Sequence, residues 1–142
     1  MYPVTGTTTK LYITFPPKPQ PILKAKLGNT ILQTQRALRA YVAEHDAVSV
    51  PLRNQDDPYE SNSDWKGCAF CVTHYPATHR HLTYGTVLNV LQGLWQCLYR
   101  DGRFTEVRFQ VEDERWGTVG VGGLGLTPLG EDAIEVTGTA RA

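Results

Sequence analysis

The chain has 142 residues, which suits a single domain with a core that needs no metal or disulfide support. Its 14 basic and 14 acidic residues cancel, which argues against a nucleic-acid partner, because such proteins usually carry a basic excess. No run of about 18 apolar residues occurs, so we expect no membrane span. The N-terminal segment MYPVTGTTTK lacks the apolar core of a signal peptide. The chain as given is therefore expected in the cytoplasm, or outside the cell if a leader has been removed.

The first part of the chain predicts a strand followed by a helix. The segment KLYITF (10–15) alternates and is rich in β-branched and aromatic residues, which is typical of a strand. A helix is expected within residues 22–45, because apolar residues recur there on one helical face: Ile31, Leu38, Tyr41 and Val42. The pair Gly28-Asn29 either weakens this helix internally or caps a shorter one.

The middle of the chain predicts two strands separated by a loop. AVSVPL (47–52) is a short strand candidate, and GCAFCVTHY (67–75) is a clearer one. Residues 53–66 are polar and rich in turn formers, so we expect a long exposed loop that carries Tyr59 and Trp65. Long loops in compact domains are often functional.

The second half predicts a helix and two further strands. The helix is expected to begin near Thr83 and to end at Asp101-Gly102, where glycine is the usual terminator. Residues 103–113 alternate between a Val/Phe face and an Arg/Gln/Glu face, which predicts a strand with one buried side. A last strand is expected over residues 118–126.

This order of elements predicts an α+β fold. We expect a two-layer sandwich, in which a mainly antiparallel, curved sheet of four to five strands carries two helices on one face. The whole chain (1–142) is expected to form one domain. Residues 1–9 and 127–142 are expected to be loose tails, with AIEV in the second tail as a candidate extra strand.

Glycines in the last strand have the spacing G-x-G-x-x-G at Gly120, Gly122 and Gly125, as in dinucleotide-binding turns. A dinucleotide site needs a helix opening on the third glycine and an acidic residue about 20 positions later. Here Thr127 and Pro128 follow at once, and only 17 residues remain after Gly125. We therefore expect structural glycines, which let a bulky neighbour such as Trp95 or a ligand approach the backbone.

Three cysteines, Cys68, Cys71 and Cys97, allow at most one disulfide, so a disulfide-built fold is not expected. Cys68 and Cys71 form C-x-x-C with histidines nearby, which suggests zinc or a redox pair. Residues three apart on a strand point to opposite faces, however, and no turn former lies between the two. We predict no metal, and buried strand cysteines instead.

Two segments, 82–98 and 107–124, resemble a group of small filamentous-fungal proteins. The shared pattern is carried by these residues: Leu82, Thr83, Tyr84, Gly85, Gly93, Leu94, Phe109, Val111, Asp113, Gly117, Val119, Gly120, Gly122 and Leu124. Small fungal proteins without cofactor motifs also include natural-product cyclases of the Diels–Alderase kind. Because the shared pattern is structural, the resemblance implies a fold rather than a function. The comparison with such cyclases suggests a role in secondary metabolism.

The function expected on this basis is a cofactor-free cyclisation or isomerisation of a small apolar natural product. Such an enzyme shapes its substrate and polarises a carbonyl through hydrogen-bond donors. The expected donors are Tyr84, His74 and Arg108. The residues expected to shape the pocket are Tyr41, Trp65, Phe70, Trp95 and Gln110. Core packing or loop anchoring would explain the same residues without catalysis.

A secreted, effector-like binding protein without catalytic activity is the alternative. The paired carboxylates Glu112, Asp113 and Glu114 are expected to form a solvated turn rather than a glycosidase site. No cofactor is expected in either case, and the oligomeric state stays open, a homodimer included.

Overall fold

The fold is seen in a computed structural model of the chain, which describes residues 2–61, 68–75 and 81–125. Its strands form one open antiparallel sheet in the order β1-β2-β5-β6-β4-β3. The strands are β1 (Tyr2–Pro3), β2 (Thr9–Thr14), β3 (Tyr59–Glu60), β4 (Ala69–His74), β5 (Val107–Asp113) and β6 (Gly117–Gly125). Both edge strands are only two residues long.

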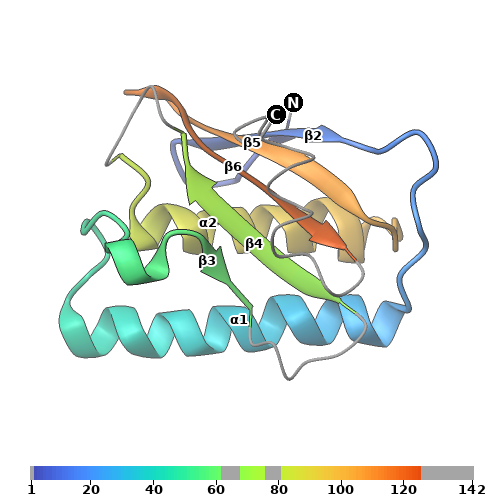
Figure 1. Cartoon of the computed structure of the whole chain (residues 1–142), viewed down its shortest axis with the longest axis horizontal. Helices are drawn as coiled ribbons and strands as arrows, with labels where there is room; N and C mark the ends of the chain where they lie inside the picture. The colour runs from blue at the N-terminus through green and yellow to red at the C-terminus, as the bar shows by residue number, and fades with distance from the viewer. Residues whose placement is uncertain (1, 62–67, 76–80, 126–142) are drawn as a thin grey trace.

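Two helices cover one face of this sheet (Figure 1). They are α1 (Lys24–His45) and α2 (Tyr84–Leu94), and α2 continues as a π-helix, η3 (Trp95–Arg100). A short 3-10 turn, η1 (Asn54–Asp56), precedes β3. The predicted two-layer α+β sandwich is thus confirmed. The sheet has six strands among the described residues, rather than four or five, because the two-residue strands β1 and β3 were not predicted.

The core lies between the helices and the inner face of the sheet. As predicted, Val107, Phe109 and Val111 of β5 are buried there, while Arg108 and Gln110 point to the outer face. The helices contribute apolar residues along their facing sides: Leu27, Ile31, Leu38, Val87, Leu91 and Leu94. A β-bulge between Val111 and Glu112 adds local curvature to the sheet.

The helix ends follow the sequence closely. Thr83 caps α2, and its hydroxyl accepts a hydrogen bond from the Thr86 backbone N–H at 3.1 Å. Gly102 takes a positive φ of 76° just after η3, as a terminating glycine does. Gly28 lies inside α1 and therefore caps no helix. A Cβ at this position would lie 2.7 Å from the Tyr99 ring, so the glycine allows the ring to approach the helix. It is a contact point between α1 and η3.

Two expectations in the first half are wrong. Residues 47–52 form no strand, because their carbonyls bind the start of α2 instead: Val48 accepts from the Gly85 N–H and Val50 from the Tyr84 N–H, both at 3.0 Å. The predicted loose N-terminal tail is, from Tyr2 on, a hairpin of β1 and β2 with Val4 buried in the core. Residues 127–142, with the AIEV segment, lie outside the described residues.

Candidate functional site

A small hairpin places an acidic residue opposite a histidine. Tyr59 of β3 pairs with Val72 of β4, and Glu60 pairs with Cys71. When this antiparallel register is continued by two residues, Asp57 stands opposite His74. Two titratable side chains that are distant in sequence therefore meet at one end of the sheet.

The Asp57 carboxylate is held by three groups of β4. Its Oδ1 accepts a hydrogen bond from the Thr73 hydroxyl at 2.6 Å and another from the His74 backbone N–H at 3.1 Å. Its Oδ2 is paired with Nδ1 of His74. The side chain of Asp57 is 11% exposed and that of His74 is 27% exposed. The pair is thus sheltered but still reachable by solvent.

This arrangement fixes the chemistry of the imidazole. A carboxylate only accepts hydrogen bonds, so Nδ1 of His74 carries the proton that Asp57 binds. Proton exchange with another molecule would then take place at Nε2. A carboxylate-oriented histidine is the usual design of a general base or acid.

A second acidic side chain holds the neighbouring tyrosine. Tyr84, the first residue of α2, is fully buried, and its hydroxyl donates to Oδ2 of Asp56 at 2.5 Å. The same hydroxyl accepts from the Arg53 backbone N–H at 3.3 Å. Burial, followed by the hydrogen bond to Asp56, raises the pKa of Tyr84 well above its ordinary value. Tyr84 therefore remains protonated and anchors the turn that precedes Asp57.

Aromatic rings surround the Asp56–Tyr84 contact. Tyr41 of α1 packs on Tyr84 with ring centroids 4.9 Å apart, and it also stacks on His45 at 4.3 Å. Tyr59 is half-buried, and its pKa is raised by burial first, then by the charge of Asp56 and by Tyr41. The expected site residues Tyr84, His74 and Tyr41 thus lie in one region, linked through the adjacent residues Asp56 and Asp57.

The other predicted site residues lie elsewhere. Arg108 and Gln110 are on the outer face of the sheet, opposite the helices. Phe70 is fully buried and stacks on Phe109 in the core, with ring centroids 6.1 Å apart. Trp95 begins η3 and stacks on Tyr99 at 4.1 Å. Trp65 lies outside the described residues.

Sequence reasoning missed Asp56 and Asp57. It assigned residues 53–66 to an exposed loop, in which acidic residues need no partner. The available signal was that this segment directly precedes the strand containing His74, so that a hairpin would bring the two together. Choosing the correct partner also needs the register, which the sequence does not specify for a two-residue strand.

The cysteines are buried and reduced. Cys68 packs in the core, and its carbonyl accepts a hydrogen bond from the Thr30 hydroxyl of α1 at 3.1 Å. Cys71 pairs with Gly123 and points to the opposite face from the core residues Phe70 and Val72. Burial raises the pKa of Cys68 to about 11 and that of Cys71 to about 12. Within the described ranges, no three His, Cys, Asp or Glu residues come close enough to hold a metal ion.

Comparisons with known proteins give no relative: the chain matches no protein-family model, no curated protein and no solved structure. The described helices include none that is long and apolar enough to cross a bilayer. The chemistry of the Asp57–His74 pair therefore carries the functional argument.

Proposed function

We propose that this protein is a cofactor-independent enzyme that moves a proton on a small apolar carbonyl compound, with isomerisation or cyclisation as the outcome. The observation that supports the proposal is the pairing of the Asp57 carboxylate with Nδ1 of His74. The sheltered position of Asp57 supports it further, because a carboxylate that two additional donors hold in place keeps the imidazole in one orientation.

The reaction is a proton transfer at carbon. Nε2 of His74 takes a proton from the carbon next to the carbonyl, and the electrons of that C–H bond form an enolate. Asp57 stabilises the imidazolium that results. When the ketone carries a neighbouring C=C bond, the enolate is a dienolate, and return of the proton from Nε2 to its far carbon gives an isomer. When the same molecule carries a second carbonyl, attack of the enolate carbon on that carbonyl carbon breaks the C=O π bond and closes a ring, and the resulting alkoxide takes the proton back from Nε2. Neither outcome consumes an oxidant, a reductant or a cofactor.

Tyr84 has a positioning role in this proposal, in place of the donor role expected from the sequence. Its hydroxyl is already bound to Asp56 and to the Arg53 backbone N–H, and the residue is fully buried. It therefore acts on the reaction through the turn that precedes Asp57. Tyr41 supports Tyr84 by ring packing.

The test is deuterium exchange into simple cyclic ketones in D2O, followed by NMR. We expect the wild-type protein to accelerate exchange at the carbon next to the carbonyl for at least one ketone of a small panel. His74→Gln should lower that acceleration by about 100-fold or more, which is the usual contribution of a general base. Asp57→Asn should lower it partially, because the imidazole remains but loses its orientation.

His45→Gln is the matched control, because it removes an imidazole from the exposed end of α1. Exchange at the wild-type rate in His74→Gln would contradict the proposal. A binding role without catalysis is the alternative, in which the Asp57 contacts only fix the hairpin against β4. Destabilisation by Asp57→Asn, with no ketone exchange in any variant, is the result expected for that role.

A further inference from the structure

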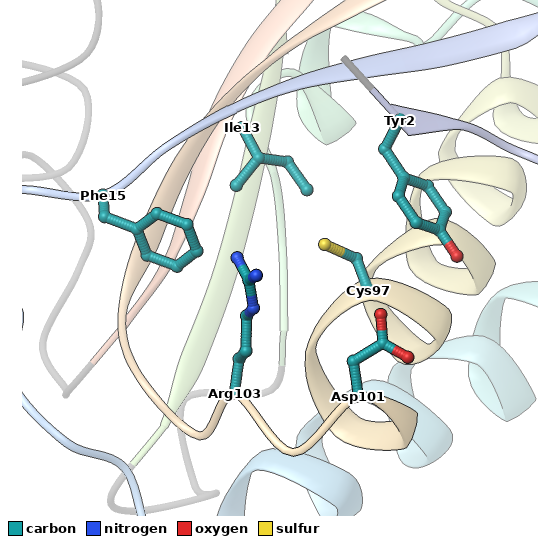
Figure 2. A pocket seen from close by; sticks show the side chains of 6 residues that line it. All are labelled: Tyr2, Ile13, Phe15, Cys97, Asp101 and Arg103. Atoms are coloured by element: carbon teal, nitrogen blue, oxygen red, sulfur yellow. The ribbon is translucent and has the colours of Figure 1, made fainter.

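A pocket of about 250 Å³ opens beside the C-terminal end of η3. Strands β1 and β2 and helix η3 form its walls, and the turn after η3 forms its rim (Figure 2). Cys97 lies about 13 positions beyond Tyr84 on the continuous helix, which corresponds to about 20 Å. The pocket is therefore separate from the Asp57–His74 pair. Its lining residues are Tyr2, Ile13, Phe15, Cys97, Asp101 and Arg103.

The pocket combines apolar walls with two opposite charges. Ile13, Phe15 and Tyr2 supply the apolar surface. The Arg103 guanidinium points into the space between Phe15 and Cys97 in Figure 2, and its carbon lies 5.7 Å from the centre of the Phe15 ring. The Asp101 carboxylate lies on the other side, next to Cys97. Neither charged side chain makes a hydrogen bond or an ion pair with another described residue.

Both charges act at the floor of the pocket. Burial raises the pKa of the Cys97 thiol, the Arg103 charge lowers it, and the Asp101 charge raises it. Both charges thus act on the Cys97 thiol, although Asp101 and Arg103 form no ion pair with each other. The floor belongs to a π-helix, a rare element that is often found at functional sites.

We propose that this pocket binds a free apolar amino acid in its zwitterionic form. The ligand carboxylate would bind Arg103, its ammonium group would bind Asp101, and its side chain would pack against Ile13 and Phe15. A ligand with a single charge satisfies one rim residue and is repelled by the other, whereas a zwitterion satisfies both.

The size of the pocket suits an amino acid such as leucine. A volume of 250 Å³ equals the share of about eight water molecules in the liquid. Leucine has about that number of non-hydrogen atoms, and its branched side chain matches an aliphatic and aromatic wall.

The test compares three probes that differ only in charge, measured by ligand-observed NMR and calorimetry. They are L-leucine, 4-methylpentanoate, which lacks the ammonium group, and 3-methylbutylamine, which lacks the carboxylate. Leucine should bind the wild-type protein more tightly than either analogue, by up to about fivefold, because each exposed ion pair contributes up to about that factor. No binding of leucine, or equal binding of 4-methylpentanoate, would overturn the proposal.

Two charge variants give a crossed prediction. Asp101→Asn should weaken leucine and tighten 4-methylpentanoate, whereas Arg103→Gln should weaken leucine and tighten 3-methylbutylamine. Both residues are exposed, so neither change should lower the melting temperature appreciably. Uniform loss of all three probes in either variant would show that charge matching is not the basis of binding. His74→Gln should leave leucine binding unchanged, so this proposal and the catalytic one can fail separately.

Discussion

At the residue scale, the glycines of β6 are explained by the strands on either side. A Cβ at Gly122 would lie 2.1 Å from the Cys71 carbonyl oxygen and 2.9 Å from Cζ of Phe109. The bulky neighbour that needs a bare backbone is therefore Phe109, not Trp95 as the sequence suggested. This close approach lets the Phe109 ring fill the core above the centre of the sheet.

Gly122→Ala should destabilise the protein by about 3 kcal/mol, at the upper end of the usual cost of overpacking, because the nearest atom belongs to a backbone. Gly120→Ala is the matched comparison in the same strand. There the nearest atoms are the Thr73 carbonyl oxygen at 3.1 Å and Cδ2 of Leu82 at 3.2 Å, so these neighbours need to shift by only a few tenths of an ångström. We expect it to cost about 1 kcal/mol in urea unfolding. Equal stability of the two variants would refute the close-approach argument.

At the element scale, the sequence predicts what is periodic and misses what depends on pairing. The two helices, β2, β4, β5 and β6 have the repeat of their secondary structure, so they were expected close to where they lie. Strands β1 and β3 have two residues each, too few to show a repeat, and they exist because a neighbouring strand offers hydrogen bonds. The meeting of Asp57 with His74 depends on that same pairing.

The candidate functional residues also divide into those that the sequence could identify and those that depend on contacts between distant segments. His74, Tyr84 and Tyr41 were selected from residue type and position, and the fold brings them into one region. Arg108 was selected from an alternating strand, whose outward face the sequence identified correctly, but that face lies away from His74. The sequence gives no sign that Tyr84 uses its hydroxyl to hold Asp56, since this contact joins a helix start to a distant turn.

The start of α2 offers a prediction about an element as a unit. Thr83→Ala removes the hydroxyl that accepts from the Thr86 N–H, and the loss of such a cap costs about 1 kcal/mol. For a chain of this size we expect the melting temperature to fall by about 3 °C. Thr83→Ser keeps the oxygen and should retain most of the stability. A serine variant as unstable as the alanine variant would assign the effect to the threonine methyl group.

At the scale of the whole molecule, buried thiols control the response to alkali. The formal net charge at neutral pH is zero, so self-repulsion contributes little there. Cys68 and Cys71 are fully or almost fully buried, and burial raises the pKa of Cys68 from 9.0 to about 11 and that of Cys71 to about 12. Above pH 9 the unfolded chain releases protons that the folded chain still holds.

The free energy of unfolding should therefore be constant up to about pH 9 and fall as the pH rises toward 11. The direction follows from proton linkage, because the state that binds fewer protons is favoured as the pH increases, and here that state is unfolded. Each thiol contributes a slope of up to about 1.4 kcal/mol per pH unit in this range. Tyr84 adds to the fall above pH 10, since burial raises its pKa as well.

Urea unfolding between pH 7 and pH 10.5 measures the effect, and Cys71→Ala should flatten the curve by the contribution of one thiol. A midpoint that does not change over this range, or an unchanged slope in Cys71→Ala, would show that Cys71 ionises equally in the folded and unfolded chains.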